Sequence, residues 1–279
     1  MYRAKQGGLG IAFYEATMET AVADRLRLEN ALRRALERDE IAVFYQPVVD
    51  SADGRISGVE ALVRWRHPER GIVSPAEFIT VAEDTGLILQ LGERVLRMAC
   101  AQARAWLDDG RRIRMAVNLS GKQLQQADLP DIVTAALNDS GLPPELLTLE
   151  ITESILMERA HEPVAMLQRL RSLGVHVAID DFGTGYSSLA YLKRFPIDYL
   201  KVDRSFVQDL PEDPDAVAIV TGIIALAHSL RLRVIAEGVE TEAQRNLLRD
   251  IGCDYQQGYH FSRPLPADIA SSHLRSTAI

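Results

Sequence analysis

From about residue 40 onward, short β-rich apolar runs alternate with amphipathic stretches of helical period. Parallel strands produce this alternation, because a parallel neighbour needs a long crossover connection, usually a helix. Strands are expected near residues 42–47, 58–65, 113–119, 146–151, 175–180, 198–202, 232–236 and 254–258. Eight strands with intervening helices predict an α/β fold of the (β/α)8-barrel type. A doubly wound open sheet is the alternative, but the sequence has no GxGxxG opening a helix and no GxxxxGK[ST], which weakens nucleotide-cofactor versions of it.

Local sequence signals predict the first residues of two helices. Ser74 precedes Pro75 and is followed three positions later by Glu77, and Thr241 is followed three positions later by Gln244. A hydroxyl residue with Glu or Gln three positions on is the signature of a capping box. We therefore predict capping boxes at both places.

The chain is long enough for one barrel and an appendage. With 279 residues and 47% hydrophobic composition it can bury a full-sized core. The expected division is a tail of a preceding domain at 1–14, a connector helix at 15–38, the barrel at 39–270 and a C-terminal tail at 271–279. Residues 11–14 are a candidate short strand, and the helix carries an apolar stripe made of Leu28, Ala31, Leu32 and Ala35.

Charge and composition exclude several classes of protein. The formal net charge of −8 argues against a DNA-binding role, since affinity for a phosphate polymer depends on clustered Lys and Arg. Two distant cysteines and six histidines without an HxH or HExxH pattern argue against a disulfide framework or a zinc site. The longest apolar stretch, residues 216–227, is shorter than the roughly 20 residues that span a bilayer, and no signal-peptide core is present. We expect a cytoplasmic domain, and a membrane anchor of the full-length protein would lie outside this chain.

Polar side chains occur at or near the ends of six apolar runs. The run that ends at Ile179 is followed by Asp180 and Asp181 and then by a glycine-rich segment. The other five runs contribute Glu60, Asn118, Glu150 with Glu153, Lys201 with Asp203, and Glu237. Because the carboxyl ends of barrel strands meet at one face, these side chains are expected to line one pocket. A solvated Asp-Asp turn is the alternative for Asp180 and Asp181 taken alone.

The proposed cluster has the chemistry of a site for hard cations. Its candidate ligands offer only oxygen atoms: Glu60, Asn118, Glu150, Asp180 and Asp181. Such a set suits Mg²⁺ or Mn²⁺ better than zinc. Adjacent aspartates can bridge two ions about 4 Å apart, the arrangement used for phosphodiester displacement. Lys201 could polarise an attacking hydroxide and Glu237 could accept its proton, while a plain salt bridge to one of the acids is the alternative role for Lys201.

Candidate substrate contacts lie on the same strands. Arg64 follows Glu60 by four residues, so both face one side of a strand, and its guanidinium suits a bidentate phosphate contact. A surface ion pair is the alternative for Arg64. Gln46, Leu62 and Tyr259 are further candidates, whereas Phe44 and Trp65 are expected in the core.

Seven motifs in order resemble the EAL family of cyclic di-GMP phosphodiesterases. They are Glu60-Ala61-Leu62, Asn118-Leu119-Ser120, Glu150-Ile151-Thr152-Glu153, DDFGTGYSSL from Asp180, Asp198-Tyr199-Leu200-Lys201, Glu237-Gly238-Val239-Glu240 and Gln257-Gly258-Tyr259. The likeness covers about residues 40 to 268. A single such motif is weak, but seven in sequence are specific to the family.

The resemblance implies a modified TIM barrel whose first strand is antiparallel to the rest. It implies hydrolysis of one phosphodiester of cyclic di-GMP to linear pGpG, with two Mg²⁺ or Mn²⁺ ions held by the five oxygen ligands. Lys201 and Glu237 would lie near the catalytic water, with Gln257 beside them. Glu153 would anchor the glycine-rich loop 181–188, which in this family couples the metal site to a dimer interface. Asp203, Gln257 and Pro264 complete the expected substrate contacts.

The first residues carry a second resemblance. Met1 to Lys5 resembles the last helix of a GGDEF diguanylate cyclase domain, which implies an upstream GGDEF domain and further sensor domains in the full-length protein. The cyclase's own catalytic motif is missing from this sequence. Two alternatives to an active phosphodiesterase stay open: an EAL-type receptor that binds cyclic di-GMP without cleaving it, and a one-metal barrel enzyme that uses Lys201 as a base.

Overall fold

The computed structural model describes residues 16–158, 163–185 and 192–276 of the 279-residue chain. The predicted strand at 11–14, the GGDEF-like tail at 1–14 and the last three residues of the 181–188 loop lie outside the described residues. Within the described residues, no helix is both long and apolar enough to cross a bilayer.

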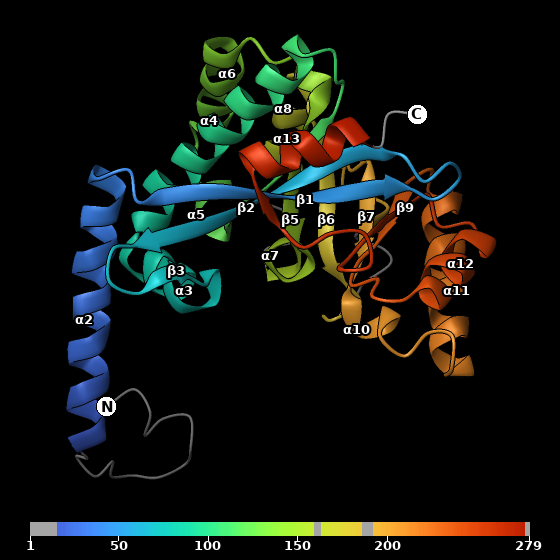
Figure 1. Ribbon diagram of the computed structural model, residues 1–279, viewed down its shortest axis with the longest axis horizontal. Helices are drawn as coiled ribbons and strands as arrows, with labels where there is room; N and C mark the ends of the chain where they lie inside the picture. Colours follow the sequence, from blue (N-terminus) through green and yellow to red (C-terminus); the bar gives the residue numbers. More distant parts are fainter. Residues whose placement is uncertain (1–15, 159–162, 186–191, 277–279) are drawn as a thin grey trace.

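Eight strands close into a barrel, as the sequence predicts (Figure 1). They are β1 (Ile41–Asp50), β2 (Ile56–His67), β4 (Arg114–Asn118), β5 (Leu147–Thr152), β6 (His176–Phe182), β7 (Tyr199–Val202), β8 (Arg233–Ala236) and β9 (Tyr255–Gln257). Their order is β1-β9-β8-β7-β6-β5-β4-β2, and pairing of β1 with β2 completes the ring. Closure brings the carboxyl ends of the parallel strands around one mouth.

The first strand is antiparallel to both of its barrel neighbours, whereas the other barrel pairings are parallel. This register places Gln46 opposite Glu60 and Val48 opposite Gln257. Two short strands, β3 (Gly71–Val73) and β10 (Leu265–Pro266), were not predicted. Strands of three and two residues are too short to show an alternating pattern in the sequence.

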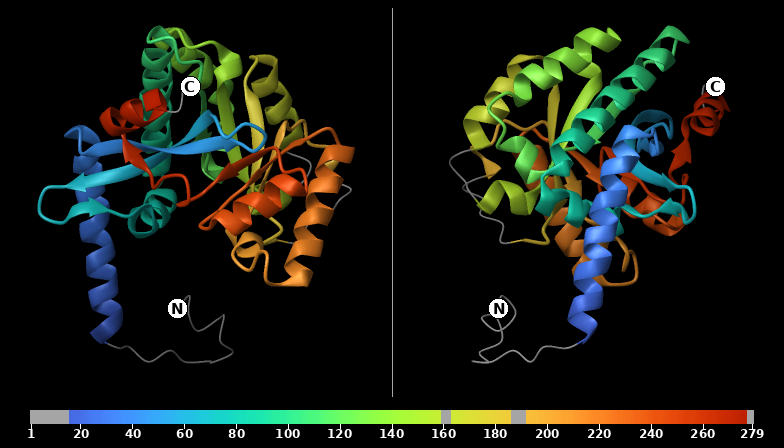
Figure 2. Two further views of the ribbon diagram at one scale, coloured as in Figure 1. Left: turned by 45° about the vertical axis from the view of Figure 1, so that its right-hand side comes forward. Right: turned by 90° about the vertical axis from the view of Figure 1, so that its left-hand side faces the viewer.

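Helices surround the barrel on its outside (Figures 1 and 2). They are α3 (Pro75–Thr85), α4 (Leu87–Asp108), α5 (Gly121–Leu124), α6 (Leu129–Ser140), α7 (Glu153–Glu158), α8 (Pro163–Ser172), α10 (Arg204–Val207), α11 (Pro214–Ser229), α12 (Glu242–Asp250) and α13 (Ala267–Ser276), with a 3₁₀ turn at Pro144–Leu146. The last helix, α13, runs across the expected boundary at residue 270 and buries Leu274.

The helix expected ahead of the barrel is present as α2 (Ala16–Glu37). Leu32 and Ala35 from the predicted stripe are fully buried, and Leu28 packs beside them. Figure 2 shows that the amino-terminal half of α2 extends away from the barrel. Among the residues of α2 whose burial is described, 25–37, those that contribute to the core lie in the carboxyl-terminal part.

One of the two predicted capping boxes forms. The Thr241 hydroxyl accepts a hydrogen bond from the Gln244 amide, and the Gln244 side chain accepts one from the Thr241 amide. At Ser74 the helix begins as predicted, with Ser74 at the N-cap and Pro75 as the first helical residue, but the capping box is absent because the serine side chain makes no capping hydrogen bond. Glu77 instead forms an ion pair with Arg70, so its carboxylate is directed away from the helix start.

An aromatic and arginine cluster fills the end of the barrel where the parallel strands begin. The Arg114 guanidinium lies 4.6 Å from the centroid of the Tyr255 ring and 5.3 Å from that of Tyr199, and it donates a 2.6 Å hydrogen bond to the Tyr199 hydroxyl. These rings pack with Val48 and Ile235 in an apolar cluster inside the barrel. This cluster fills much of the interior at that end, where a cavity of about 30 Å³ remains beside Arg114 and Tyr199.

Aspartates fasten the amino ends of two strands. Asp254 accepts hydrogen bonds from the Val234 amide at 2.9 Å, from Arg233 at 3.0 Å and from a ring nitrogen of His228 at 2.8 Å. Burial opposes the change, but these hydrogen bonds lower the pKa of Asp254. Asp198 accepts from a strand amide in the same way. The charge of each carboxylate thus contributes to stability.

Candidate active site

The polar residues predicted from the strand ends meet at the open mouth of the barrel. Asn118 and Glu150 are direct neighbours across β4 and β5, and Asp180 and Lys201 come from the next two strands. Glu237 follows β8, and Gln257 is the last residue of β9. Alternation along each strand directs these side chains inward.

Lys201 lies at the centre of the cluster and is 1% exposed. Its Nζ atom is 2.7 Å from a carboxylate oxygen of Glu237, 2.8 Å from Glu150, 3.2 Å from Asp180 and 3.5 Å from Glu60. Burial would lower the pKa of Lys201, but the four carboxylates raise it well above its ordinary value. The salt bridge considered as an alternative role for this lysine is therefore present, and it involves four acids rather than one.

Glu60 is held as an ionised acceptor. Asn118 donates a 2.7 Å hydrogen bond to one of its carboxylate oxygens, and Gln257 donates one of 2.7 Å to the other. Burial alone would raise the pKa of Glu60, but Lys201 and these two amides lower it below its ordinary value. A carboxylate whose charged form is stabilised in this way is a ready ligand for a cation.

Glu150 and Glu237 have the opposite electrostatics. Burial, reinforced by the neighbouring carboxylates, raises the pKa of Glu150 well above its ordinary value despite Lys201. Burial raises the pKa of Glu237 to about 8 for the same reasons. These acids are crowded beyond what one lysine neutralises, which is the condition under which a bound cation is most strongly favoured.

Two groups of carboxylates have the geometry to hold metal ions. One comprises Glu60, Glu150 and Asp180, the other Asp180, Asp181 and Glu237, and within each the ligand oxygens lie within 4.8 Å of one another. Asp180 belongs to both. The buried Oε1 atom of Gln257 has no hydrogen-bond partner among the described residues. An all-oxygen site with spare acceptor capacity fits a hard divalent cation.

Asp181 differs from Asp180 in conformation and exposure. Its backbone φ is 53°, in the left-handed region that non-glycine residues seldom adopt, and its amide donates a 2.9 Å hydrogen bond to the Asp180 carboxylate. The pairing of β6 with β7 also shifts register here. Burial and Asp180 raise the pKa of Asp181. With this backbone conformation the Asp181 carboxylate lines the pocket. The two aspartates therefore do not form the solvated turn that was the alternative.

Glu153 lies beneath the start of the glycine-rich loop. It is fully buried, and one of its carboxylate oxygens accepts a 2.8 Å hydrogen bond from the Gly183 amide. Gly183 follows the two aspartates directly in the chain. Glu153 is therefore placed to position the loop that carries Asp181, and it belongs to neither group of candidate metal ligands.

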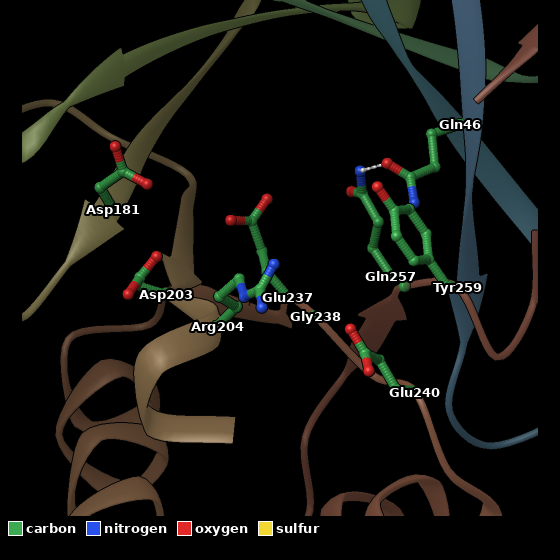
Figure 3. Close-up of a pocket in the computed structure, with 10 residues that line it drawn as sticks. Gln46, Asp181, Asp203, Arg204, Glu237, Gly238, Glu240, Gln257 and Tyr259 are labelled. Atoms are coloured by element: carbon green, nitrogen blue, oxygen red, sulfur yellow. Dashed lines mark hydrogen bonds between the residues drawn. The ribbon is translucent and has the colours of Figure 1, made fainter. Parts of the chain in front are cut away.

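A pocket of about 270 Å³ opens beside the carboxylates (Figure 3). Four of the expected substrate contacts line it: Gln46, Asp203, Gln257 and Tyr259. Gln46 is tied to Gln257 by a 3.2 Å hydrogen bond, and Tyr259 is 49% exposed with Arg263 stacked on its ring. An amide pair and an exposed aromatic ring can recognise the edge and face of a base.

The other three expected contacts do not line this pocket, and their contacts with a substrate stay predictions. Leu62 lines a separate, mainly apolar cavity of about 280 Å³ that also reaches Asn118. The Arg64 guanidinium lies 5.7 Å from the centroid of the Phe44 ring and donates to the Val63 carbonyl at 2.7 Å. It forms no ion pair with the residues that the structure describes, and its contact with a phosphate stays a prediction. Pro264 is half-buried just before β10.

The core predictions hold in part, and two charged residues of the pocket were not predicted as site residues. Trp65 is fully buried, while Phe44 is only partly buried. Arg204 and Glu240 line the pocket, although neither was named as a site residue. Arg204 directly follows Asp203, and Glu240 closes the quoted segment that starts at Glu237, so their sequence neighbours were the available signal.

These features define a class: a (β/α)8-barrel protein with a lysine-centred carboxylate cluster at its mouth, suited to divalent cations. The family follows from comparison with known proteins. The model of the EAL domain family matches residues 29–264, and the chain belongs to this family.

The chain is similar to longer curated proteins. It is 48% identical over 270 residues to the bifunctional diguanylate cyclase/cyclic di-GMP phosphodiesterase MucR of Pseudomonas aeruginosa, covering 96% of this chain and 39% of MucR. It is 46% identical over 265 residues to the cyclic di-GMP phosphodiesterase NbdA of the same organism, covering 95% of this chain and 34% of NbdA. The chain thus spans less than half the length of each of these relatives.

A solved structure is similar over most of the chain. The PaMucR phosphodiesterase in complex with cyclic di-GMP has a TM-score of 0.84 and 48% sequence identity, and the match covers 88% of this chain and 99% of that structure. The structural likeness therefore extends across the barrel and its site.

Proposed function

We propose that this chain hydrolyses cyclic di-GMP to linear pGpG with the help of two Mg²⁺ or Mn²⁺ ions. The observation that carries the proposal is the complete carboxylate cluster around Lys201, in which no matched acid, amide or lysine is replaced. Its relatives MucR and NbdA are named as cyclic di-GMP phosphodiesterases, which supports the substrate.

The proposed cation ligands are Glu60, Asn118, Glu150, Asp180 and Asp181. Divalent ions bound there supply Lewis acidity, which lowers the pKa of a bound water and neutralises charge on the phosphate. Glu60 is already ionised, as its lowered pKa indicates. Asn118 would ligate through its side-chain oxygen, which is free to do so because the amide nitrogen is the atom that donates to Glu60.

Lys201 and Glu237 have roles at the attacking water. Lys201 keeps the carboxylates together and can donate a hydrogen bond to the water. The raised pKa of Glu237, about 8, keeps this acid mostly protonated at pH 7 without cations, and cations bound beside it would lower that pKa so that it can accept a proton. The water oxygen forms a bond to phosphorus and the P–O3′ bond breaks. The 3′ oxygen leaves with a proton, and the product keeps a 5′ phosphate, so the only co-reactant is water.

The proposal extends to the partners of the chain and to its location in the cell. We infer a homodimer through the region of the glycine-rich loop. The start of this loop is held by the hydrogen bond that the Gly183 amide donates to Glu153. An upstream GGDEF domain is supported by the bifunctional name of MucR, and further sensor domains stay a prediction. The domain would act in the cytoplasm, where cyclic di-GMP is made.

The test is direct product formation. The protein is incubated with cyclic di-GMP and Mg²⁺ or Mn²⁺, and pGpG is followed by chromatography. Glu60→Ala should abolish product, because it removes a cation ligand that two amides orient. Glu212→Ala is the matched control, since Glu212 is an exposed acid outside the pocket.

The same assay separates the alternatives. Binding of cyclic di-GMP without product by the parent protein would favour the EAL-type receptor, and neither binding nor product would favour a different barrel enzyme with Lys201 as base. Ca²⁺ in place of Mg²⁺ should inhibit, because its larger and looser coordination shell would misplace the water. Full turnover with Ca²⁺ alone would contradict that account.

A further inference from the structure

One positively charged side chain of the pocket, that of Arg204, has no part in the reaction described above. Arg204 begins α10 directly after Asp203, and it is the one positively charged residue among the described residues that line the pocket. Four acids line the same space: Asp181, Asp203, Glu237 and Glu240. In Figure 3 the Arg204 side chain lies between Asp203 and Glu237. A phosphate-bearing ligand thus meets a pocket whose protein charge is mostly negative.

Lys201 cannot meet the phosphate from this side. It is buried below the pocket, and its ammonium group is already shared among four carboxylates. Arg204, by contrast, is exposed, and its guanidinium makes no hydrogen bond or ion pair with the residues that the structure describes. A guanidinium surrounded by acids yet unpaired is available to a ligand.

The backbone of the neighbouring strand end holds Arg204 in place. Gly238 has a φ of +70°, and a Cβ atom added to it would lie 2.3 Å from the Cβ atom of Arg204. Any side chain at position 238 would therefore displace the Cβ atom of Arg204. The glycine that follows Glu237 allows Arg204 to pack directly beside that acid.

We propose that the Arg204 guanidinium binds the phosphodiester of the substrate that is not cleaved, an inference that rests on the proposed function. Cyclic di-GMP carries two phosphodiesters on opposite sides of one ring. One can lie at the deep carboxylate cluster while the other stays at the exposed rim, where Arg204 is found. The planar fork of a guanidinium matches two non-bridging phosphate oxygens, a geometry that a lysine does not offer.

The experiment compares substrates with two and with one phosphodiester. Arg204→Met keeps the aliphatic stem but removes the charge, and Arg204→Lys keeps the charge without the fork. For Arg204→Met we expect KM for cyclic di-GMP to rise about 10- to 100-fold, the range for losing a charged hydrogen bond, with kcat nearly unchanged. Arg204→Lys should recover part of the loss. The loss of kcat/KM on bis(p-nitrophenyl) phosphate, which has one phosphodiester, should be much smaller.

Arg249→Met is the matched control, because Arg249 is an arginine on α12 that pairs with Asp250 and lies outside the pocket. An unchanged KM for cyclic di-GMP in Arg204→Met would overturn the proposal, as would equal losses on both substrates. Binding of cyclic di-GMP is also measured by calorimetry with Ca²⁺. A parent protein that binds but yields no pGpG contradicts the proposed function alone, and weaker binding by Arg204→Met would still support the role of the arginine.

Discussion

Replacing Lys201 with methionine tests the electrostatic account of the site. The change removes a buried ammonium group that lies within 3.5 Å of four carboxylates, while it keeps most of the side-chain volume. Removing one partner of a buried ion pair lowers stability by about 3–5 kcal/mol, because the remaining charge is left uncompensated. We expect a loss of this size in the free energy of unfolding, measured by urea titration at pH 7 in EDTA.

The pH dependence of this loss has a definite sign. Without the lysine, burial should raise the pKa of Glu150 and Glu237 in the folded state further above the unfolded values. A carboxyl group whose pKa is higher in the folded than in the unfolded state does not lower stability while it is protonated in both states. It lowers the stability of the folded state once the pH rises above its unfolded pKa. The penalty of Lys201→Met should therefore be smaller at pH 5 than at pH 8.

Metal ions should restore part of the stability. A ligand that binds only the folded state at one hundred times its Kd adds about 2.7 kcal/mol, and Mn²⁺ can replace the missing positive charge. Turnover should stay lost, because the lysine no longer orients the water. Lys122→Met is the control, since Lys122 is an exposed lysine on α5. A Lys201→Met protein as stable as the parent in EDTA at pH 8 would refute the reasoning.

Three further changes test the surroundings of the site. Glu153→Gln keeps the shape but weakens the charged hydrogen bond to the Gly183 amide, and we expect kcat to fall about tenfold in the pGpG assay. Gly258→Ala places a Cβ atom 2.1 Å from the Val239 carbonyl oxygen, so we expect a loss of at least about 1–3 kcal/mol in urea unfolding. Asp254→Asn should lower stability by about 1–3 kcal/mol at pH 7. Because the pKa of Asp254 is lowered on folding, its contribution is lost as the pH falls below the ordinary value of 3.8, and the difference should vanish in acid.

Each of these predictions has a contrary result. Unchanged kcat in Glu153→Gln would show that the bond to the loop is dispensable for turnover. A fully stable Gly258→Ala protein would mean that the two loops at the barrel mouth separate without loss. A deficit of Asp254→Asn that is the same at pH 3 and pH 7 would show that the charge of the carboxylate is not what stabilises the strand ends.

Local pattern was sufficient for the barrel strands, because alternation and run length are properties of neighbouring residues. All eight predicted strands are present, and the capping box at Thr241 forms as expected. The box at Ser74 fails because Arg70 competes for Glu77, a contact that depends on how the hairpin of β2 and β3 folds back. The antiparallel first strand came from the family resemblance, since a strand's direction in a sheet leaves no mark on its own sequence.

The same division holds for the site. The sequence alone determined which acids and amides occur at strand ends, and the rule that barrel strands present their carboxyl ends at one face predicted that they meet. Only the tertiary structure decided that Lys201 is shared among four carboxylates, that Arg64 turns onto Phe44, and that Arg204 enters the pocket. These three contacts depend on how the barrel closes, on the register of its strands and on the space that Gly238 leaves beside Arg204. All of them involve residues that are far apart in the chain.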